Sequence, residues 1–226
     1  MYIKNSSGSQ PKNDIVFNSI SNILVNGEWI KTTDEHIAYK DIDGYRHVIL
    51  TIEGEVRELK KIPFTPDVHP LTCEDLKCST EVFNYGQNFY VYFKAPKDGF
   101  ISVYLDDGKL TQRLLPYQRD INANTYKVES DHVYYFFSKK TDKNVGMVDE
   151  VELVTDSKME QNRLFVLYSL IDFGKPLLDD KKSDKQDGYI IPKSLPSPKF
   201  QEWLQKTRSY NRNIELGEID LTIKGK

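Results

Sequence analysis

Two adjacent carboxylates, Asp106 and Asp107, are the residues whose types and spacing most readily suggest chemistry. Paired carboxylates can hold a metal ion or act as an acid–base pair. Successive side chains of a β-strand, however, point to opposite faces, so these two cannot easily converge on one atom. Asp107-Gly108 is also a favoured hairpin turn. The pattern therefore favours a turn over a catalytic site.

Cys73 and Cys78, in the stretch CEDLKC, are the next candidate pair. They are too few for a disulfide framework and lack the second ligand pair of a zinc site, so we expect no metal. The two thiols could close one small loop or stay free, and the sequence does not decide between these. Cys73 and His69 lie close in sequence, but no orienting acid or strand–turn–helix setting accompanies them. A thiol enzyme is therefore not expected.

The remaining titratable residues do not form a recognisable catalytic motif. The sequence contains neither a P-loop nor a GxGxxG motif, so we expect no nucleotide cofactor. A hydrolase centre would need Asp106, Asp107 or Cys73 to meet a histidine in one pocket. The histidines that could take part in such a centre are His36, His47, His69 and His132. We expect instead a protein without enzymatic activity and without a cofactor.

A surplus of aromatic residues is the more interesting feature, because 12% of the residues are aromatic. Several of them are expected on strand faces opposite the main apolar stripes. An exposed face of this kind could stack sugars or receive a protein partner. We favour the alternative, in which a helix carrying Trp203 or an N-terminal unit covers that face. The candidate binding residues are Tyr90, Tyr92, Tyr104 and Tyr134, with Phe136 beside them.

The elements that would position these residues begin with a small N-terminal β unit, residues 1–62, whose polar start is expected to be flexible. Asp43-Gly44 separates two β-prone runs and predicts a hairpin. Glu53-Gly54 offers a second turn and suggests a three-stranded meander over residues 36–62. The proline-rich stretch that follows predicts an extended connector over residues 63–78.

Residues 79–226 form the second predicted domain, in which short strands alternate with turns. The run RLFVLYSLI is apolar on both faces, as expected for a central strand covered on both sides. Strands without repeated helices between them indicate an antiparallel sandwich. The other predicted strands are NFYVYFKA, FISVYLDD, KLTQRLL, TYKVE, HVYYFFS and EVELVT.

One helix is predicted near the C-terminus, over residues 198–210. Ser197 is a candidate N-cap and Pro198 fits the first helical position. Phe200, Trp203, Leu204 and Thr207 would form the face that packs on the sheet. A last strand, IELGEIDLTI, follows. The predicted fold is therefore a mainly β, antiparallel sandwich, for which an immunoglobulin-like layout is one option, with one C-terminal helix and the small N-terminal unit.

Composition excludes some classes of function. A net charge of −3 argues against a dedicated nucleic-acid binder. No apolar run is long enough to cross a bilayer, so no membrane span is expected. The start MYIKNSSGSQPKND lacks the layout of a signal peptide, although it could be the cut edge of a longer precursor. The cellular location therefore stays open.

The order of several motifs resembles a known bacterial family. The motifs are DGFISVYLDD, LLPYQ, VYYFFS, NRLFVLYS and LPSPKFQEWLQKTR, and the resemblance covers roughly Ser79 to Lys226. In this order they resemble the uncharacterised proteins catalogued as domain of unknown function 4384. The resemblance implies a β-sandwich module, commonly in cell-envelope proteins and sometimes attached to caspase-like peptidase or kinase domains. It supplies no catalytic residues and no ligand, and it favours an envelope or periplasmic location, although the first residues do not have the expected layout of a signal peptide.

Taken together, the sequence favours an accessory or protein-interaction module of a bacterial envelope or signalling assembly, with another protein as its partner. The alternative is a β-sandwich that binds a carbohydrate or another small ligand through the tyrosine-rich face.

Overall fold

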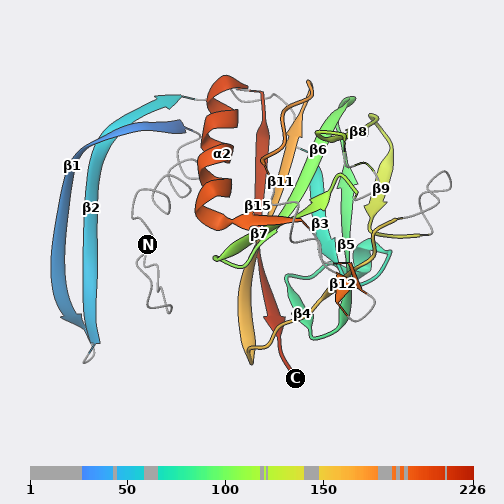
Figure 1. Cartoon of the computed structure of the whole chain (residues 1–226), viewed down its shortest axis with the longest axis horizontal. Helices are drawn as coiled ribbons and strands as arrows, with labels where there is room; N and C mark the ends of the chain where they lie inside the picture. The colour runs from blue at the N-terminus through green and yellow to red at the C-terminus, as the bar shows by residue number, and fades with distance from the viewer. Residues whose placement is uncertain are drawn as a thin grey trace. The chain divides into compact units, whose positions relative to one another are not determined.

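The computed structural model shows a mainly β protein with one α-helix near the C-terminus, as far as its residues are described (Figure 1). The chain divides into two compact units, Met1–Lys61 and Ile62–Lys226. The structure describes residues 27–42, 45–58, 66–117, 120, 122–139, 148–177, 185–186, 189–190, 193–211 and 213–226.

The first unit contains a long β-hairpin. Strand β1 (Gly27–Ile42) pairs antiparallel with β2 (Tyr45–Glu58), and Ile42 lies opposite Tyr45. This confirms the predicted hairpin. Its turn residues, Asp43-Gly44, and the start that was expected to be flexible lie outside the described residues.

The second predicted turn of this unit, Glu53-Gly54, is wrong. Both residues lie inside β2, where Glu53 pairs with Asp34 and Gly54 pairs with Thr32. The register shifts between Thr32 and Asp34, which is a bulge-like irregularity. A glycine inside a strand often marks such an irregularity rather than a turn. The described hairpin therefore has two long strands in place of a three-stranded meander.

The predicted proline-rich connector is also wrong over much of its length. Strand β3 (Asp67–Leu71) and the short 3-10 helix η1 (Leu76–Cys78) lie within it. Pro70 is tolerated because β3 pairs with a neighbour on one side alone among the described strands. A proline in an edge strand costs no ladder hydrogen bond when its nitrogen faces outward.

The second unit contains two main sheets. The smaller sheet is built on β5 (Gln87–Lys94), which pairs antiparallel with β3 and with β9 (Val133–Phe136) and β10 (Val151–Leu153). The alternation of apolar and polar residues predicted β5 correctly. The pairing of β3 with β5 places the segment before the disulfide loop at one edge of this sheet.

The larger sheet has the strand order β14-β7-β6-β11-β15-β4, with β8 also pairing with β6. Its pairs are antiparallel except for the parallel pair β15–β4. The strands of this sheet are β4 (Val82–Asn84), β6 (Gly99–Asp106), β7 (Leu110–Leu115), β8 (Tyr126–Val128), β11 (Met159–Ser169), β14 (Ser194–Pro196) and β15 (Glu215–Lys224). A further small pair is formed by β12 (Lys185–Gln186) and β13 (Tyr189–Ile190).

The two sheets pack face to face as a sandwich, as predicted. Their main core takes alternate residues from both sheets, among them Val91 and Phe93 of β5 and Val103 of β6. Strand β11 lies between β6 and β15 and is buried on both faces from Leu164 to Ser169. The prediction of a central strand covered on both sides is therefore confirmed.

Helix α2 (Ser197–Tyr210) covers the other face of the larger sheet. Phe200 and Leu204 are buried there in a second apolar cluster, and Trp203 packs against it, as the helical spacing predicts. The predicted N-cap is wrong: Pro196 occupies that position, and Ser197 Oγ donates instead to Asp106 Oδ1 at 2.8 Å. The Ser197 hydroxyl therefore bonds to the buried carboxylate of Asp106 and does not cap the backbone N–H groups of the helix.

Candidate functional site

Two of the four predicted tyrosines share one face of the smaller sheet. Tyr90 and Tyr92 alternate with core residues of β5 and so lie on its outer face. The rings of His69, Tyr92 and Tyr135 form a row across β3, β5 and β9, with centroid distances of 5.8 Å and 5.6 Å. Because of this crowding Tyr92 is only 6% exposed. Tyr90 is the more accessible of the two.

Tyr104 lies elsewhere and is fully buried. Its ring centroid is 4.9 Å from that of Phe200 and 5.6 Å from that of Trp203, both on α2. The burial also raises the pKa of its hydroxyl. Tyr104 therefore cannot bind a ligand at an exposed face. Here the helix covers the aromatic residue, as in the alternative that the sequence favours.

Tyr134 occupies a third position, on the side of β9 that packs against the main core. Its ring stacks on that of Phe136 at 5.4 Å, and its hydroxyl accepts a hydrogen bond from the backbone N–H of Glu129 at 2.8 Å. The four candidate tyrosines therefore do not form one binding surface. Only Tyr90 and Tyr92 remain together.

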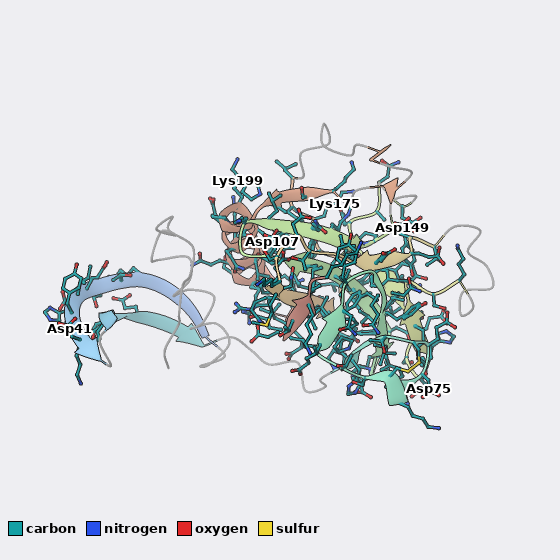
Figure 2. All side chains as sticks on the ribbon, turned by 90° about the horizontal axis from the view of Figure 1, so that it is seen from below. Asp41, Asp75, Asp107, Asp149, Lys175 and Lys199 are labelled. Atoms are coloured by element: carbon teal, nitrogen blue, oxygen red, sulfur yellow. A yellow bond between two sulfur atoms is a disulfide. The ribbon has the colours of Figure 1, made fainter. Side chains whose placement is uncertain are left out.

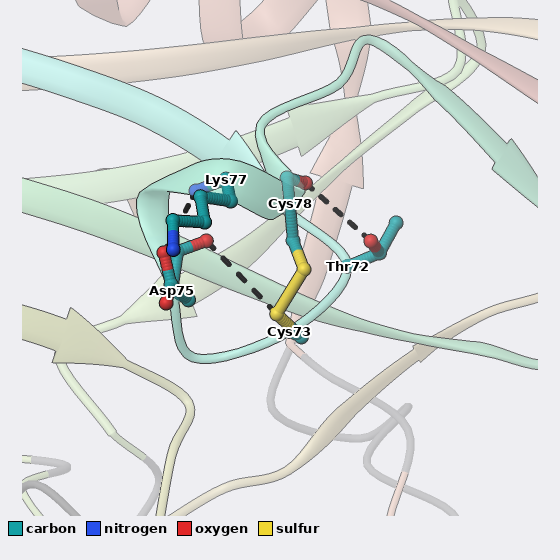
Figure 3. The surroundings of a disulfide bond; sticks show 5 residues. All are labelled: Thr72, Cys73, Asp75, Lys77 and Cys78. Atoms are coloured by element: carbon teal, nitrogen blue, oxygen red, sulfur yellow. Dashed lines mark hydrogen bonds between the residues drawn. A yellow bond between two sulfur atoms is a disulfide. The ribbon is translucent and has the colours of Figure 1, made fainter.

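The two cysteines form a disulfide, Cys73–Cys78, which resolves the alternative that the sequence left open (Figure 3). The closed loop is further held by hydrogen bonds from Thr72 N to Cys78 O at 3.1 Å and from Lys77 N to Asp75 Oδ1 at 2.9 Å. With its sulfur in this bond, Cys73 has no thiolate to act as a nucleophile.

The disulfide loop borders an open hollow on the surface. Glu74 anchors the loop by accepting a hydrogen bond from Ser138 Oγ, beyond the end of β9, at 2.6 Å. Figure 2 shows Asp75, on this loop, on the opposite side of the second unit from Lys199 of α2. Carboxylate and hydroxyl groups beside an aromatic ring can bind polyhydroxy ligands. The hollow is lined by Thr72, Cys73, Glu74, Asp75 and Tyr90.

Asp106 and Asp107, the residues that first suggested chemistry, hold the turn between β6 and β7. Asp107 Oδ1 accepts hydrogen bonds from the backbone N–H groups of Lys109 and Leu110, both at 2.7 Å. Asp106 is buried and accepts three hydrogen bonds, from Gly108 N, Thr111 Oγ1 and Ser197 Oγ. Burial raises the pKa of Asp106 although these bonds oppose the shift. The turn interpretation is confirmed.

A second buried carboxylate, Glu218 of β15, was missed by the sequence analysis. Its side chain is 8% exposed, and Arg163 Nη1 lies 3.7 Å from its Oε2. Neither carboxylate oxygen has a hydrogen-bond partner. Burial raises the pKa of Glu218 to about 7, although the charges of Arg163 and Arg208 oppose the shift. The sequence pattern gave no signal for it, because Glu218 lies on the strand face opposite Ile219 and Leu221, which pack in the main core. Helix α2 covers that opposite face.

The described residues do not assemble the hydrolase centre that was considered. His69 Nε2 lies 2.8 Å from Asp67 Oδ1, and His132 packs edge-on against Tyr134. Asp106 lies beneath α2 on the larger sheet, whereas Cys73 lies on a loop of the smaller sheet. No group of three or more potential metal ligands occurs among the described residues. The residues of that hypothesis are therefore separated.

The hairpin of the first unit exposes apolar side chains. Ile37 is 45% exposed and Tyr39 is 63% exposed, and their spacing places them on one face of β1. Ile49, opposite Ala38, is exposed on the other face. In the described structure β1 and β2 pair only with each other, so each has one unpaired edge. The sequence analysis did not single out these residues.

Within the part of the chain that the structure describes, no helix is long and apolar enough to span a membrane. Comparisons of the chain with protein-family models, with curated proteins and with solved structures find no match. The function must therefore be argued from the residues themselves.

Proposed function

We propose that this protein is a non-enzymatic protein-interaction module. The observation that carries the proposal is the N-terminal hairpin, a two-stranded ribbon with strands of 16 and 14 residues and with exposed Ile37 and Tyr39 on one face. An isolated two-stranded hairpin is only marginally stable in water. Packing of another protein on this face would bury the apolar side chains and stabilise the ribbon.

We further propose that the module belongs to a bacterial envelope or signalling assembly, in which it has an accessory role. The resemblance of residues 79–226 to domain of unknown function 4384 supports this assignment. In this proposal the hairpin binds the partner and the sandwich is the folded domain to which the hairpin is attached. Tyrosine is enriched among the residues that dominate binding energy at protein interfaces. Tyr39 is therefore the residue on which partner binding should depend most.

Replacing Tyr39 with glutamate is expected to weaken partner binding about 10- to 100-fold, because it removes an aromatic contact and places a charge in an apolar interface. The partner is first captured by cross-linking from native cells and identified by mass spectrometry. The dissociation constant is then measured with the purified partner by calorimetry.

Lys40→Glu is the control, because it places the same glutamate at the exposed neighbouring position on the other face of β1. It changes the charge by two units where Tyr39→Glu changes it by one, so it is the stricter test of a pure charge effect. We expect it to change the affinity by less than about threefold. Equal loss with both variants would show that charge, and not the apolar face, determines binding. Failure to enrich any protein over an unrelated β-sandwich would contradict the proposal itself.

A second candidate function is the binding of a carbohydrate or another small ligand, and the hollow at the disulfide loop is the observation that favours it. Tyr90 supplies a ring, and Glu74 and Asp75 supply carboxylates that can accept hydrogen bonds from hydroxyl groups.

Under this function, Tyr90→Ala should abolish saturable glycan binding, because stacking on the ring would supply much of the affinity. A glycan array identifies ligands and calorimetry measures the affinity of each variant. Tyr85→Ala removes a half-exposed tyrosine outside the hollow and should leave the affinity unchanged. An array without saturable binding, or equal affinity in Tyr90→Ala, would exclude this function for the hollow.

A further inference from the structure

A carboxylate of the larger sheet lies near each end of helix α2. At its first residue, Ser197 Oγ donates to Asp106 of β6. In its last turn, the buried Arg208 lies within electrostatic range of Glu218 of β15. Between these ends the apolar residues Phe200 and Leu204 pack on the sheet. The two carboxylates, Asp106 and Glu218, differ in how many hydrogen bonds they accept.

Glu218 is the poorly satisfied one. Asp106 accepts three hydrogen bonds, whereas neither oxygen of Glu218 accepts any. Its Oε2 is 3.7 Å from Arg163 Nη1, too far for a hydrogen bond. An ionised carboxylate that is 92% removed from water, at 8% exposure, loses its hydration without gaining a hydrogen bond.

The surrounding charges do not compensate for this loss. Arg208 of α2 and Arg163 of β11 favour the ionised form of Glu218, while Asp220 on its own strand and Asp106 of β6 disfavour it. Arg163 also shares its charge with Asp220, because its Nε lies 3.1 Å from Asp220 Oδ1. Burial therefore outweighs the two cations, so the neutral acid is favoured below about pH 7.

We propose that α2 is a pH-responsive cover of the larger sheet, which binds the sheet tightly when Glu218 is protonated and loosens at its C-terminal end when Glu218 ionises. Release of the last turn, which contains Arg208, would let water reach the ionised carboxylate. The attraction between Arg208 and the ionised Glu218 opposes this release, but the cost of burying the charge is larger. The pH-dependent docking of α2 does not depend on the proposed function of the protein.

The direction of the response follows from the two states of Glu218. With its pKa raised from 4.5 to about 7, the docked state binds the proton more tightly than the opened state. Docking is therefore strongest below about pH 4.5, weakens as the pH rises through about 7 and changes little above it. Loosening of the last turns brings water to the buried side chain of Leu204, which lies one turn before Arg208 on the same face of the helix.

Hydrogen exchange followed by mass spectrometry tests the proposal on the full chain at pH 5 and pH 8. After correction for intrinsic exchange rates, protection of the amides near Arg208 should fall up to roughly 100-fold between these values. A Trp29→Phe background makes Trp203 the sole tryptophan. Its emission should shift to longer wavelength over the same pH range, because its ring lies 5.5 Å from that of Phe200 beneath the helix.

Glu218→Gln keeps the shape of the side chain without its charge, and it should hold α2 in the protected state at both pH values. Glu202→Gln removes a carboxylate from an exposed position of α2 and should retain the full pH response. An unchanged pH response in Glu218→Gln would overturn the proposal. Equal protection of the wild-type helix at pH 5 and pH 8 would overturn it as well.

Discussion

Replacing Phe200 with alanine is expected to lower the free energy of unfolding by about 3–5 kcal/mol. Phe200 is fully buried beneath α2, and its ring lies 4.9 Å from that of Tyr104 and 5.1 Å from that of Phe165. Truncation removes the contacts of the Phe200 ring with Tyr104 of β6 and Phe165 of β11 and leaves a cavity beneath the helix. Urea titration followed by circular dichroism measures the loss.

Lys199→Ala is the matched control, because it shortens the neighbouring helical side chain, which is exposed (Figure 2). It should change the free energy of unfolding by less than about 0.5 kcal/mol. Phe200→Leu keeps most of the volume and should lie between the two variants. A loss below about 1 kcal/mol for Phe200→Ala would mean that α2 does not pack on the sheet as described.

Local periodicity explains why part of this fold could be predicted from sequence. The alternation in β5, β6 and β15 indicates which side of each strand faces the main core, and the helical spacing of Phe200 and Leu204 indicates the buried side of α2. Burial on both faces likewise identified β11. Such patterns depend on one element at a time, so they can be detected without knowledge of the neighbouring elements.

Contacts between distant segments could not be predicted in this way. β3 becomes a strand because β5 offers it an edge, although Pro70 argues against a strand locally. β4 is short and joins the sheet by a parallel pairing with β15. Glu218 has the local pattern of a solvent-exposed strand residue, and only the packing of α2 buries it. Secondary-structure propensity and hydrophobic periodicity are local properties, so they do not predict these tertiary contacts.

In the candidate site, too, some features follow from local sequence patterns and others depend on tertiary contacts. Tyr90 and Tyr92 share a face because alternation places them there, which the sequence could indicate. Tyr104 and Tyr134 belong to other strands, and their surroundings depend on α2 and on the core. The row of His69, Tyr92 and Tyr135 depends on the register of three strands, which the sequence did not specify.

Replacing Asp106 with alanine is expected to destabilise the second unit by about 3–5 kcal/mol. The substitution removes the acceptor for Gly108 N at 2.6 Å and for Thr111 Oγ1 and Ser197 Oγ, both at 2.8 Å. The hydroxyl groups of Thr111 and Ser197 are then left in a buried position without this acceptor, and each unsatisfied buried group costs about 1–3 kcal/mol. The third donor, Gly108 N, belongs to an exposed residue and costs less. The link between the hairpin turn and the first residue of α2 is lost at the same time.

Asp107→Ala separates this role from that of an ordinary turn residue. Asp107 also accepts hydrogen bonds, but it is exposed and water can replace it as the acceptor. Its removal should cost about 1 kcal/mol, measured by the same urea titration. Asp106→Asn keeps one acceptor oxygen and should fall between the two alanine variants. If the adjacent alanine variants lost equal stability, the turn alone would account for both residues, and Asp106 would not anchor α2.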